Sequence, residues 1–137
     1  EICVSQVNLE DYKGLILIGG YAMDRLRYQP SLSGSRNTAP AVELLRKAVQ
    51  RMDAGQIAIG TICHSLWLFC ADPELIKGRH VTCAHNIVCD VENAGGELVI
   101  ANGETVDVHA DGLLITGRHP GSVEAFDDLF LKTIQAI

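Results

Sequence analysis

The sequence has few aromatic residues, little positive charge and no long apolar run. Aromatic side chains make up 5% of the 137 residues, and 11 Lys and Arg residues face 17 Asp and Glu residues, for a net charge of −6. An acidic chain has no electrostatic attraction for nucleic acid or anionic lipid, so we expect neither as a partner. Because no apolar run approaches the roughly 20 residues that cross a bilayer, we expect no membrane-spanning segment.

The sequence also lacks the motifs that typically bind metals and nucleotides. The histidines follow neither HxH nor HxxxH spacing, and there is no GxGxxG loop or Walker lysine, so we expect no metal ion and no other cofactor. The cysteines are odd in number and include no CxxC pair: Cys3, Cys63, Cys70, Cys83 and Cys89. This usage favours a reduced, cytoplasmic protein over a disulfide framework, and the N-terminus lacks the basic start and apolar stretch of a signal peptide.

Hydrophobic residues make up 47% of the chain, which is enough for the core of one domain over residues 1–137. The runs 15–18 and 57–62 are almost entirely apolar, which is typical of strands buried on both faces of a parallel sheet. Residues 28–38 are rich in turn formers and predict an exposed loop. Further strands are expected at 80–83, 97–100, 105–109 and 113–116, with a hairpin turn at Asn102-Gly103, and helices at 40–54, 65–71, 87–94 and 121–134. The alternation of strands and helices predicts an α/β fold with a mainly parallel sheet.

The best candidate for a chemical site is the segment 60–65, which follows the second apolar run. A turn of small residues from a buried strand into a helix is how a nucleophile elbow lifts a side chain above a sheet. Cys63 has this place, where the start of the helix favours a thiolate, and the adjacent His64 could orient or deprotonate the sulfur. The alternative is that Cys63 is a small buried apolar side chain. Ser65, where the helix begins, is a further candidate for oxyanion or substrate binding.

Three other segments carry candidate site residues. Gly19-Gly20 closes the first apolar run, and a glycine at the carboxyl end of a parallel strand lets a backbone N–H approach a substrate oxygen. Asp24 either orients an imidazole or is a solvated charge. His119 lies between the last strand and the last helix, from where it can reach the same edge of the sheet as Gly19-Gly20 and Cys63. Arg118 beside it is either an anion contact or a cap for neighbouring carbonyls.

These segments resemble the DJ-1/PfpI superfamily, which has the fold of the class I glutamine amidotransferases. The resemblance runs from about residue 9 to the C-terminus and rests on the run 11–20, the elbow Ile62-Cys63-His64, the turn Asn93-Ala94-Gly95, Arg118 and Pro120. It implies a three-layer, flavodoxin-like sandwich with a nucleophile elbow. An amidotransferase would need a His-x-Glu pair late in the chain, and the segment that begins at His119 lacks the Glu.

The PfpI-like intracellular protease branch is the most similar, because it places a histidine directly after the nucleophilic cysteine. That branch completes its site with an acidic residue from a neighbouring subunit, a few residues after the Gly-Gly, where this chain has Asp24. The resemblance therefore implies a Cys63–His64–Asp24 triad that is formed in a homo-oligomer. The DJ-1 branch places its histidine where this chain has Ala84, and His85 is expected near the pocket as a substrate contact.

Family members also begin with a strand–helix–strand unit that carries a glutamate beside the cysteine. This chain starts beyond such a unit, so we expect an N-terminally incomplete domain that lacks on the order of 30–50 residues.

The resemblance implies peptide hydrolysis, or glyoxalase or deglycase chemistry on small carbonyl electrophiles. Cys63 would be the nucleophile, His64 the general acid and base, and Gly20 an oxyanion contact. The substrate would be a small molecule or a peptide. The alternative is a non-enzymatic stress protein, a redox sensor or chaperone in which Cys63 oxidises reversibly.

Overall fold

The computed structural model describes residues 1–29 and 34–137. Its central sheet has four strands in the order β1-β2-β8-β7. Three of them run parallel, namely β1 (Gly14–Leu17), β2 (Ala58–Ile62) and β8 (Leu114–Gly117), and β7 (Val108–Asp111) pairs antiparallel with β8. The expected α/β fold with a mainly parallel sheet is confirmed.

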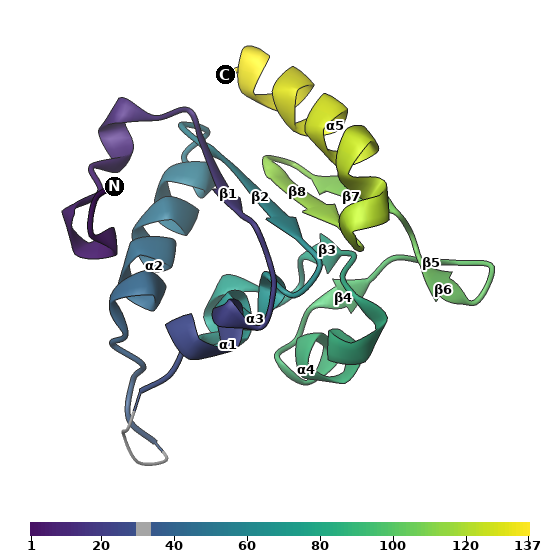
Figure 1. The fold of residues 1–137 in the computed structure, drawn as a ribbon, viewed down its shortest axis with the longest axis horizontal. Coiled ribbons are helices and arrows are strands. Elements are labelled where there is room, and N and C mark those ends of the chain that lie inside the picture. The colour runs from purple at the N-terminus through teal and green to yellow at the C-terminus, as the bar shows by residue number, and fades with distance from the viewer. Residues whose placement is uncertain (30–33) are drawn as a thin grey trace.

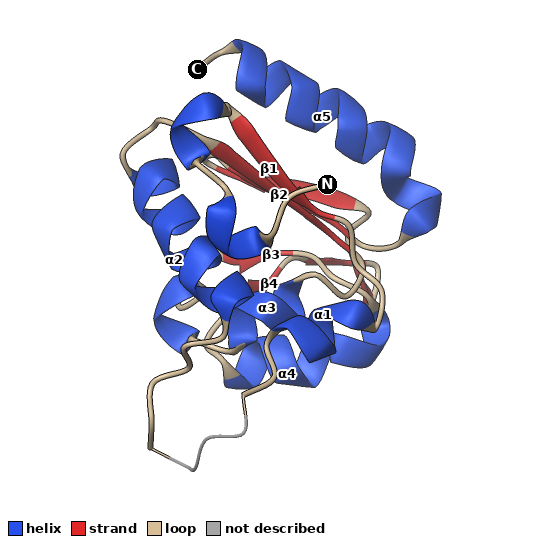
Figure 2. Ribbon diagram, turned by 60° about the vertical axis from the view of Figure 1, so that its left-hand side comes forward, coloured by secondary structure: helices blue, strands red, loops and turns tan. Residues whose placement is uncertain are grey.

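Helices cover both faces of the sheet (Figures 1 and 2). On one side lie α1 (Ala22–Leu26), α2 (Pro40–Asp53), α3 (Leu66–Cys70) and α4 (Val88–Asn93), and on the other side lies α5 (Val123–Gln135). Two apolar clusters fill the two spaces between these layers, one centred on α2 and α3 and a smaller one beneath α5. The expected three-layer sandwich is therefore present.

Strand β2 shows why the sheet accepts helices on both faces. All five of its residues are buried, as its apolar sequence predicts. Gly60 lies beneath α5, where an added Cβ would come within 2.7 Å of Phe126 and 3.1 Å of Phe130. The glycine therefore lets the two stacked aromatic rings pack directly on the strand.

The remaining elements are short. Two small ladders join β3 (His80–Val81) to β4 (Glu97–Leu98) in parallel and β5 (Ile100–Ala101) to β6 (Glu104–Thr105) antiparallel. Short 3-10 helices cover Val4–Gln6, Leu9–Asp11, Pro73–Leu75, His85–Ile87 and Pro120–Ser122. The predicted hairpin is confirmed, because Asn102 and Gly103 both have positive φ, as a tight turn between β5 and β6 requires.

The structure corrects several local expectations. Strand β1 is the edge of this sheet and is not buried on both faces, since Ile16 lies on the α5 side beyond the reach of that helix and is exposed. The strand expected at 80–83 ends at Val81, because the N–H of Thr82 donates to the side-chain oxygen of Thr116. The short helix α1 was not predicted. Of the loop expected at 28–38, residues 30–33 lie outside the described residues, and the rest contains neither helix nor strand.

The sheet brings three loops to one edge. Strands β1, β2 and β8 run in the same direction, so the segments that follow them lie side by side. Gly19 follows β1, Cys63 follows β2 and Arg118 follows β8. An added Cβ on Gly19 would lie 2.6 Å from the carbonyl oxygen of Ile62 and 3.3 Å from the Cβ of Cys63, whereas one on Gly20 would meet nothing within 4 Å. Gly19 is thus the residue that lets the end of β1 approach the Cys63 turn.

We predict that alanine at these two glycines has different effects. Both glycines have positive φ, so Gly20→Ala should lower the free energy of unfolding by about 1 kcal/mol through backbone strain alone. Gly19→Ala adds the clash with the backbone of Ile62 and should cost about 2–4 kcal/mol. Urea unfolding followed by circular dichroism measures both values. Equal losses for the two variants would contradict the close approach at Gly19.

Candidate active site

Cys63 has an unusual backbone conformation. Its φ is +63°, and among the described residues only Asn102 shares a positive φ without being glycine. This conformation strains a residue with a Cβ, and such strain persists where the surrounding structure enforces it. The turn is the expected nucleophile elbow, and it leaves the thiol half-buried between the sheet and the loops at its edge.

Hydrogen bonds from several segments hold this turn. The N–H of Cys63 donates to the carbonyl oxygen of Gly117 at 3.0 Å, and the N–H of Ala84 donates to the carbonyl oxygen of Cys63 at 3.1 Å. The hydroxyl of Ser65 lies within hydrogen-bond distance of the carbonyl oxygens of Leu17 and Ile62. Ser65 is fully buried and does not line the pocket, so it fastens the elbow to β1.

His64 lies directly beside the sulfur. Its Nδ1 is 2.9 Å from the Sγ of Cys63, and its ring packs against those of Tyr21 and Trp67, with centroids 5.0 Å and 4.9 Å away. Tyr21 and Trp67 also contact each other, and the indole N–H of Trp67 donates to Asp90, which fixes this cluster of three rings. The other ring nitrogen, Nε2, is buried and has no hydrogen-bond partner in the described part of the chain.

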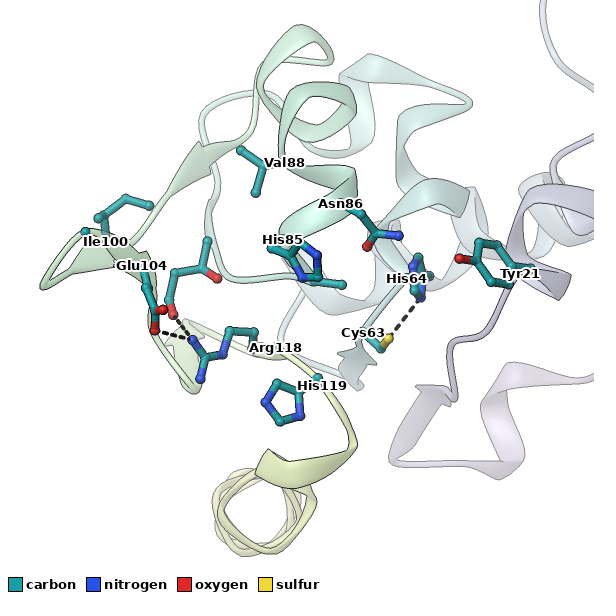
Figure 3. A pocket seen from close by; sticks show the side chains of 13 residues that line it. Tyr21, Cys63, His64, His85, Asn86, Val88, Ile100, Glu104, Arg118 and His119 are labelled. Carbon is teal, nitrogen blue, oxygen red and sulfur yellow. Dashed lines mark hydrogen bonds and ion pairs between the residues drawn. The ribbon is translucent and has the colours of Figure 1, made fainter.

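A pocket of about 740 Å³ opens in front of this pair (Figure 3). Of the residues proposed from the sequence, it brings together Cys63, His64, His85, Arg118 and His119. Gly19, Gly20, Ser65 and Asp24 do not line it. Sequence reasoning missed the other polar and aromatic lining residues, which come from segments without a motif: Tyr21, Asn86, Glu104 and Thr105.

Two further imidazoles line the pocket, and in Figure 3 His85 lies above the level of Cys63 and His119 below it. His85 begins the 3-10 helix that leads into α4, and it is exposed. His119 follows β8, and its Nδ1 accepts the backbone N–H of Gly121 at 2.8 Å. Because that nitrogen is an acceptor, the neutral ring of His119 carries its proton on Nε2 and is a hydrogen-bond donor there.

Arg118 is held by neighbours within the chain. One terminal nitrogen donates to Glu104 at 3.0 Å and to the carbonyl oxygen of Thr105 at 3.2 Å, and the other lies 2.8 Å from a carboxylate oxygen of Asp107. Of the two alternatives that the sequence left open, the contact with a neighbouring carbonyl is therefore present. Arg118 ties the β5–β6 hairpin to the end of β8.

Asp24 lies on α1, where it pairs with Arg27 at 2.6 Å. Its side chain is about half exposed, and no contact joins it to His64 among residues 1–29 and 34–137. Within the described part of one chain, the pair formed by Cys63 and His64 is thus not completed by a carboxylate.

The other thiols near the elbow are protected by burial. Burial raises the pKa of the Cys70 thiol to about 11 and that of Cys83 to about 12. In the described ranges there is no group of three His, Cys, Asp or Glu residues that could hold a metal ion, and no helix there has the length and apolarity to cross a membrane.

Comparisons with known proteins identify the family of this chain. The model of the DJ-1/PfpI family matches residues 1–133. The deglycase PfpI of Pyrococcus furiosus is 29% identical over 135 residues, which cover 98% of this chain and 70% of that protein.

Two solved structures share the fold. A two-domain protein of Anabaena variabilis, with DJ-1/ThiJ/PfpI-like and ferritin-like domains, superposes with a TM-score of 0.78 and 21% identity over 96% of this chain and 32% of its own. Schizosaccharomyces pombe DJ-1 gives a TM-score of 0.67 and 17% identity over 89% of this chain and 55% of its own. This chain thus spans about a third and about half of those two structures. With its parallel sheet, its cysteine elbow and a family match over nearly its whole length, the chain belongs to the DJ-1/PfpI family.

Proposed function

We propose that the protein is a cysteine-dependent enzyme that acts on small carbonyl electrophiles such as 2-oxoaldehydes. One observation carries this proposal: the strained elbow holds the Sγ of Cys63 2.9 Å from the Nδ1 of His64, at the mouth of a pocket of about 740 Å³. That volume is within the range of small-molecule sites. The relative from Pyrococcus furiosus is a deglycase, which supports carbonyl chemistry over peptide cleavage.

The first step follows from the geometry of the pair. His64 takes the thiol proton of Cys63 on Nδ1, and the sulfur attacks the aldehyde carbon. A sulfur–carbon bond forms, the carbonyl electron pair moves to oxygen, and the imidazolium returns the proton to that oxygen. The backbone N–H of His64, the residue after the nucleophile, is the proposed donor to the developing oxyanion. Conversion of a 2-oxoaldehyde and water into a 2-hydroxy acid is redox-neutral, so it requires no oxidant.

We propose that a second copy of the chain completes the site with Asp24. The Nε2 of His64 has no hydrogen-bond partner in the described part of the chain, and a carboxylate there would fix the ring. Because this nitrogen is buried within the chain, a neighbouring side chain must shift when the second copy binds. Ile18 and Tyr21, which are 80% and 70% exposed, form an apolar surface close to His64 that a second copy would cover. The assembly is then a homo-oligomer whose active sites lie at subunit interfaces.

The second candidate function is that of a redox-sensing stress protein or chaperone. It is favoured by the same half-buried thiol, which peroxide can reach and oxidise to a sulfenic acid. A reducing, cytoplasmic location suits both functions, since none of the five cysteines is paired in a disulfide.

Turnover distinguishes the two functions. Purified protein should convert methylglyoxal, and Cys63→Ala should lower that rate by about 10³-fold or more because the nucleophile is lost. Cys89→Ala removes an exposed thiol outside the pocket and should keep full activity. Product formation is measured as 2-hydroxy acid by chromatography. Absence of turnover in a protein whose Cys63 oxidises and recovers would favour the redox sensor.

Mixing two inactive variants tests the shared site. Cys63→Ala and Asp24→Ala should each be inactive alone, whereas their co-expressed mixture should recover about a quarter of wild-type activity if random dimers form. Recovery arises because a mixed interface unites the Cys63 of one subunit with the Asp24 of the other. Arg27→Ala removes the partner of Asp24 within the chain and is the matched control, which should keep activity. No recovery in the mixture would rule out a site shared between subunits.

Labelling against pH tests the burial of the other thiols. Because the pKa values of Cys70 and Cys83 are raised, their thiolates are scarce at pH 8 and accumulate only as the pH approaches about 11. Iodoacetamide at pH 8 should therefore label Cys63 in the folded protein and leave Cys70 and Cys83 unlabelled, as read by peptide mass spectrometry. In urea all of them should react. Labelling of Cys83 at equal rates with and without urea would contradict its burial.

A further inference from the structure

The wall of the pocket that faces Cys63 is built from the β5–β6 hairpin. Glu104 and Thr105 come from its second strand, Ile100 comes from its first strand, and Arg118 reaches them from the end of β8 (Figure 3). Among the described residues that line the pocket, Glu104 is the acidic one and Arg118 is the arginine, and no Asp or Lys lines it. The electrostatics of this wall therefore depend on how that pair is arranged.

Both terminal nitrogens of the Arg118 guanidinium are already engaged. They contact the carboxylates of Glu104 and Asp107 and the carbonyl oxygen of Thr105, at 3.0, 2.8 and 3.2 Å. The remaining nitrogen, Nε, is buried and has no hydrogen-bond partner in the described part of the chain. A substrate carboxylate that approached this arginine would meet the carboxylates of Glu104 and Asp107 that already pair with it. The anion contact expected from the sequence is thus already occupied by the protein's own carboxylates.

The charges at this wall do not cancel. One guanidinium stands between two carboxylates, which leaves about one negative charge, and the whole chain carries −6. Glu104 is 75% exposed, so its carboxylate is accessible from the pocket mouth. Two imidazoles complete the pocket: His85, and His119, whose Nε2 is left free by the bond of its Nδ1 to Gly121. Their N–H groups suit carbonyl and hydroxyl oxygens, and the excess negative charge of Glu104 and Asp107 over Arg118 repels a carboxylate.

We propose that Glu104 makes this site select uncharged carbonyl compounds over anionic ones, neutral 2-oxoaldehydes over 2-oxoaldehydes that carry a carboxylate, with Arg118 as the residue that positions it. This inference names a substrate class for the proposed function and rests on it for turnover. The charge selection itself can be measured on the thiol without turnover. Two thiol reagents of nearly equal size, neutral iodoacetamide and anionic iodoacetate, report it at Cys63.

The expected result is a ratio of alkylation rates. The quantity measured is the rate of alkylation by iodoacetamide divided by the rate of alkylation by iodoacetate, in one buffer at pH 8. This ratio should be roughly five- to tenfold larger at Cys63 than for free cysteine. Glu104→Gln removes the charge and keeps an amide oxygen for Arg118, so it should lower the ratio by about three- to tenfold. Asp107→Asn should lower it less, because Asp107 does not line the pocket. Addition of 0.5 M salt shortens the electrostatic screening length to about 3–5 Å, so it should also reduce the rate ratio at Cys63.

Glu10→Gln is the matched control. Glu10 is 77% exposed, its carboxylate is 4.0 Å from Arg51, and its segment lies on the opposite side of the molecule from the β5–β6 hairpin (Figure 1). The same loss of one charge there should leave the rate ratio unchanged. A ratio at Cys63 equal to that of free cysteine, or equal in wild type and Glu104→Gln, would overturn the charge selection.

Turnover separates this inference from the proposed function. With the proposed function intact, methylglyoxal should be used with a higher kcat/KM than 4,5-dioxopentanoate, a 2-oxoaldehyde that also carries a carboxylate, and Glu104→Gln should narrow the difference by the factor seen in the alkylation ratio. Charge-selective alkylation without any turnover of methylglyoxal would remove the proposed function and keep the charge selection. Turnover of 4,5-dioxopentanoate as fast as methylglyoxal in wild type would remove the charge selection and keep the proposed function.

Discussion

The backbone at Cys63 is the constraint on which the rest of the site depends. A residue with a Cβ at positive φ costs on the order of 1 kcal/mol or more, and the fold keeps it there with bonds from separate segments. Gly117 accepts its N–H, Ala84 donates to its carbonyl oxygen, and Ser65 fastens the turn to the first strand. With the turn fixed, the sulfur faces the pocket and His64 lies beside it.

The two ends of the pocket have separate origins and separate roles. The end with Cys63 comes from the sheet, whose parallel strands place the elbow and the glycine turn at one edge. The far end comes from a hairpin held by Arg118, which is a local addition to that sheet. In such a fold the sheet holds the proposed nucleophile and the loops set what reaches it.

Much of the fold follows from local patterns. The apolar run of β2, the helical stripe of α2 and the Asn102-Gly103 turn each predict the element that the structure contains. Strand β1 departs from its pattern because a run of apolar residues does not say whether a neighbour covers both faces, and Ile16 is exposed. The hydroxyl of Ser65 is buried against the backbone of the elbow, a contact that its place at the start of a helix does not reveal.

The sequence by itself determined the α/β class, the elbow, and Cys63 and His64 as neighbours in a candidate site, because all of these depend on residues close together along the chain. Only the tertiary structure decided that Tyr21 packs on His64 and that Glu104 and Asp107 form ion pairs with Arg118. These contacts join segments many residues apart, and charge patterns along a chain do not reveal which charges meet. The strand order brings those segments to one edge of the sheet, and that arrangement exists only after folding.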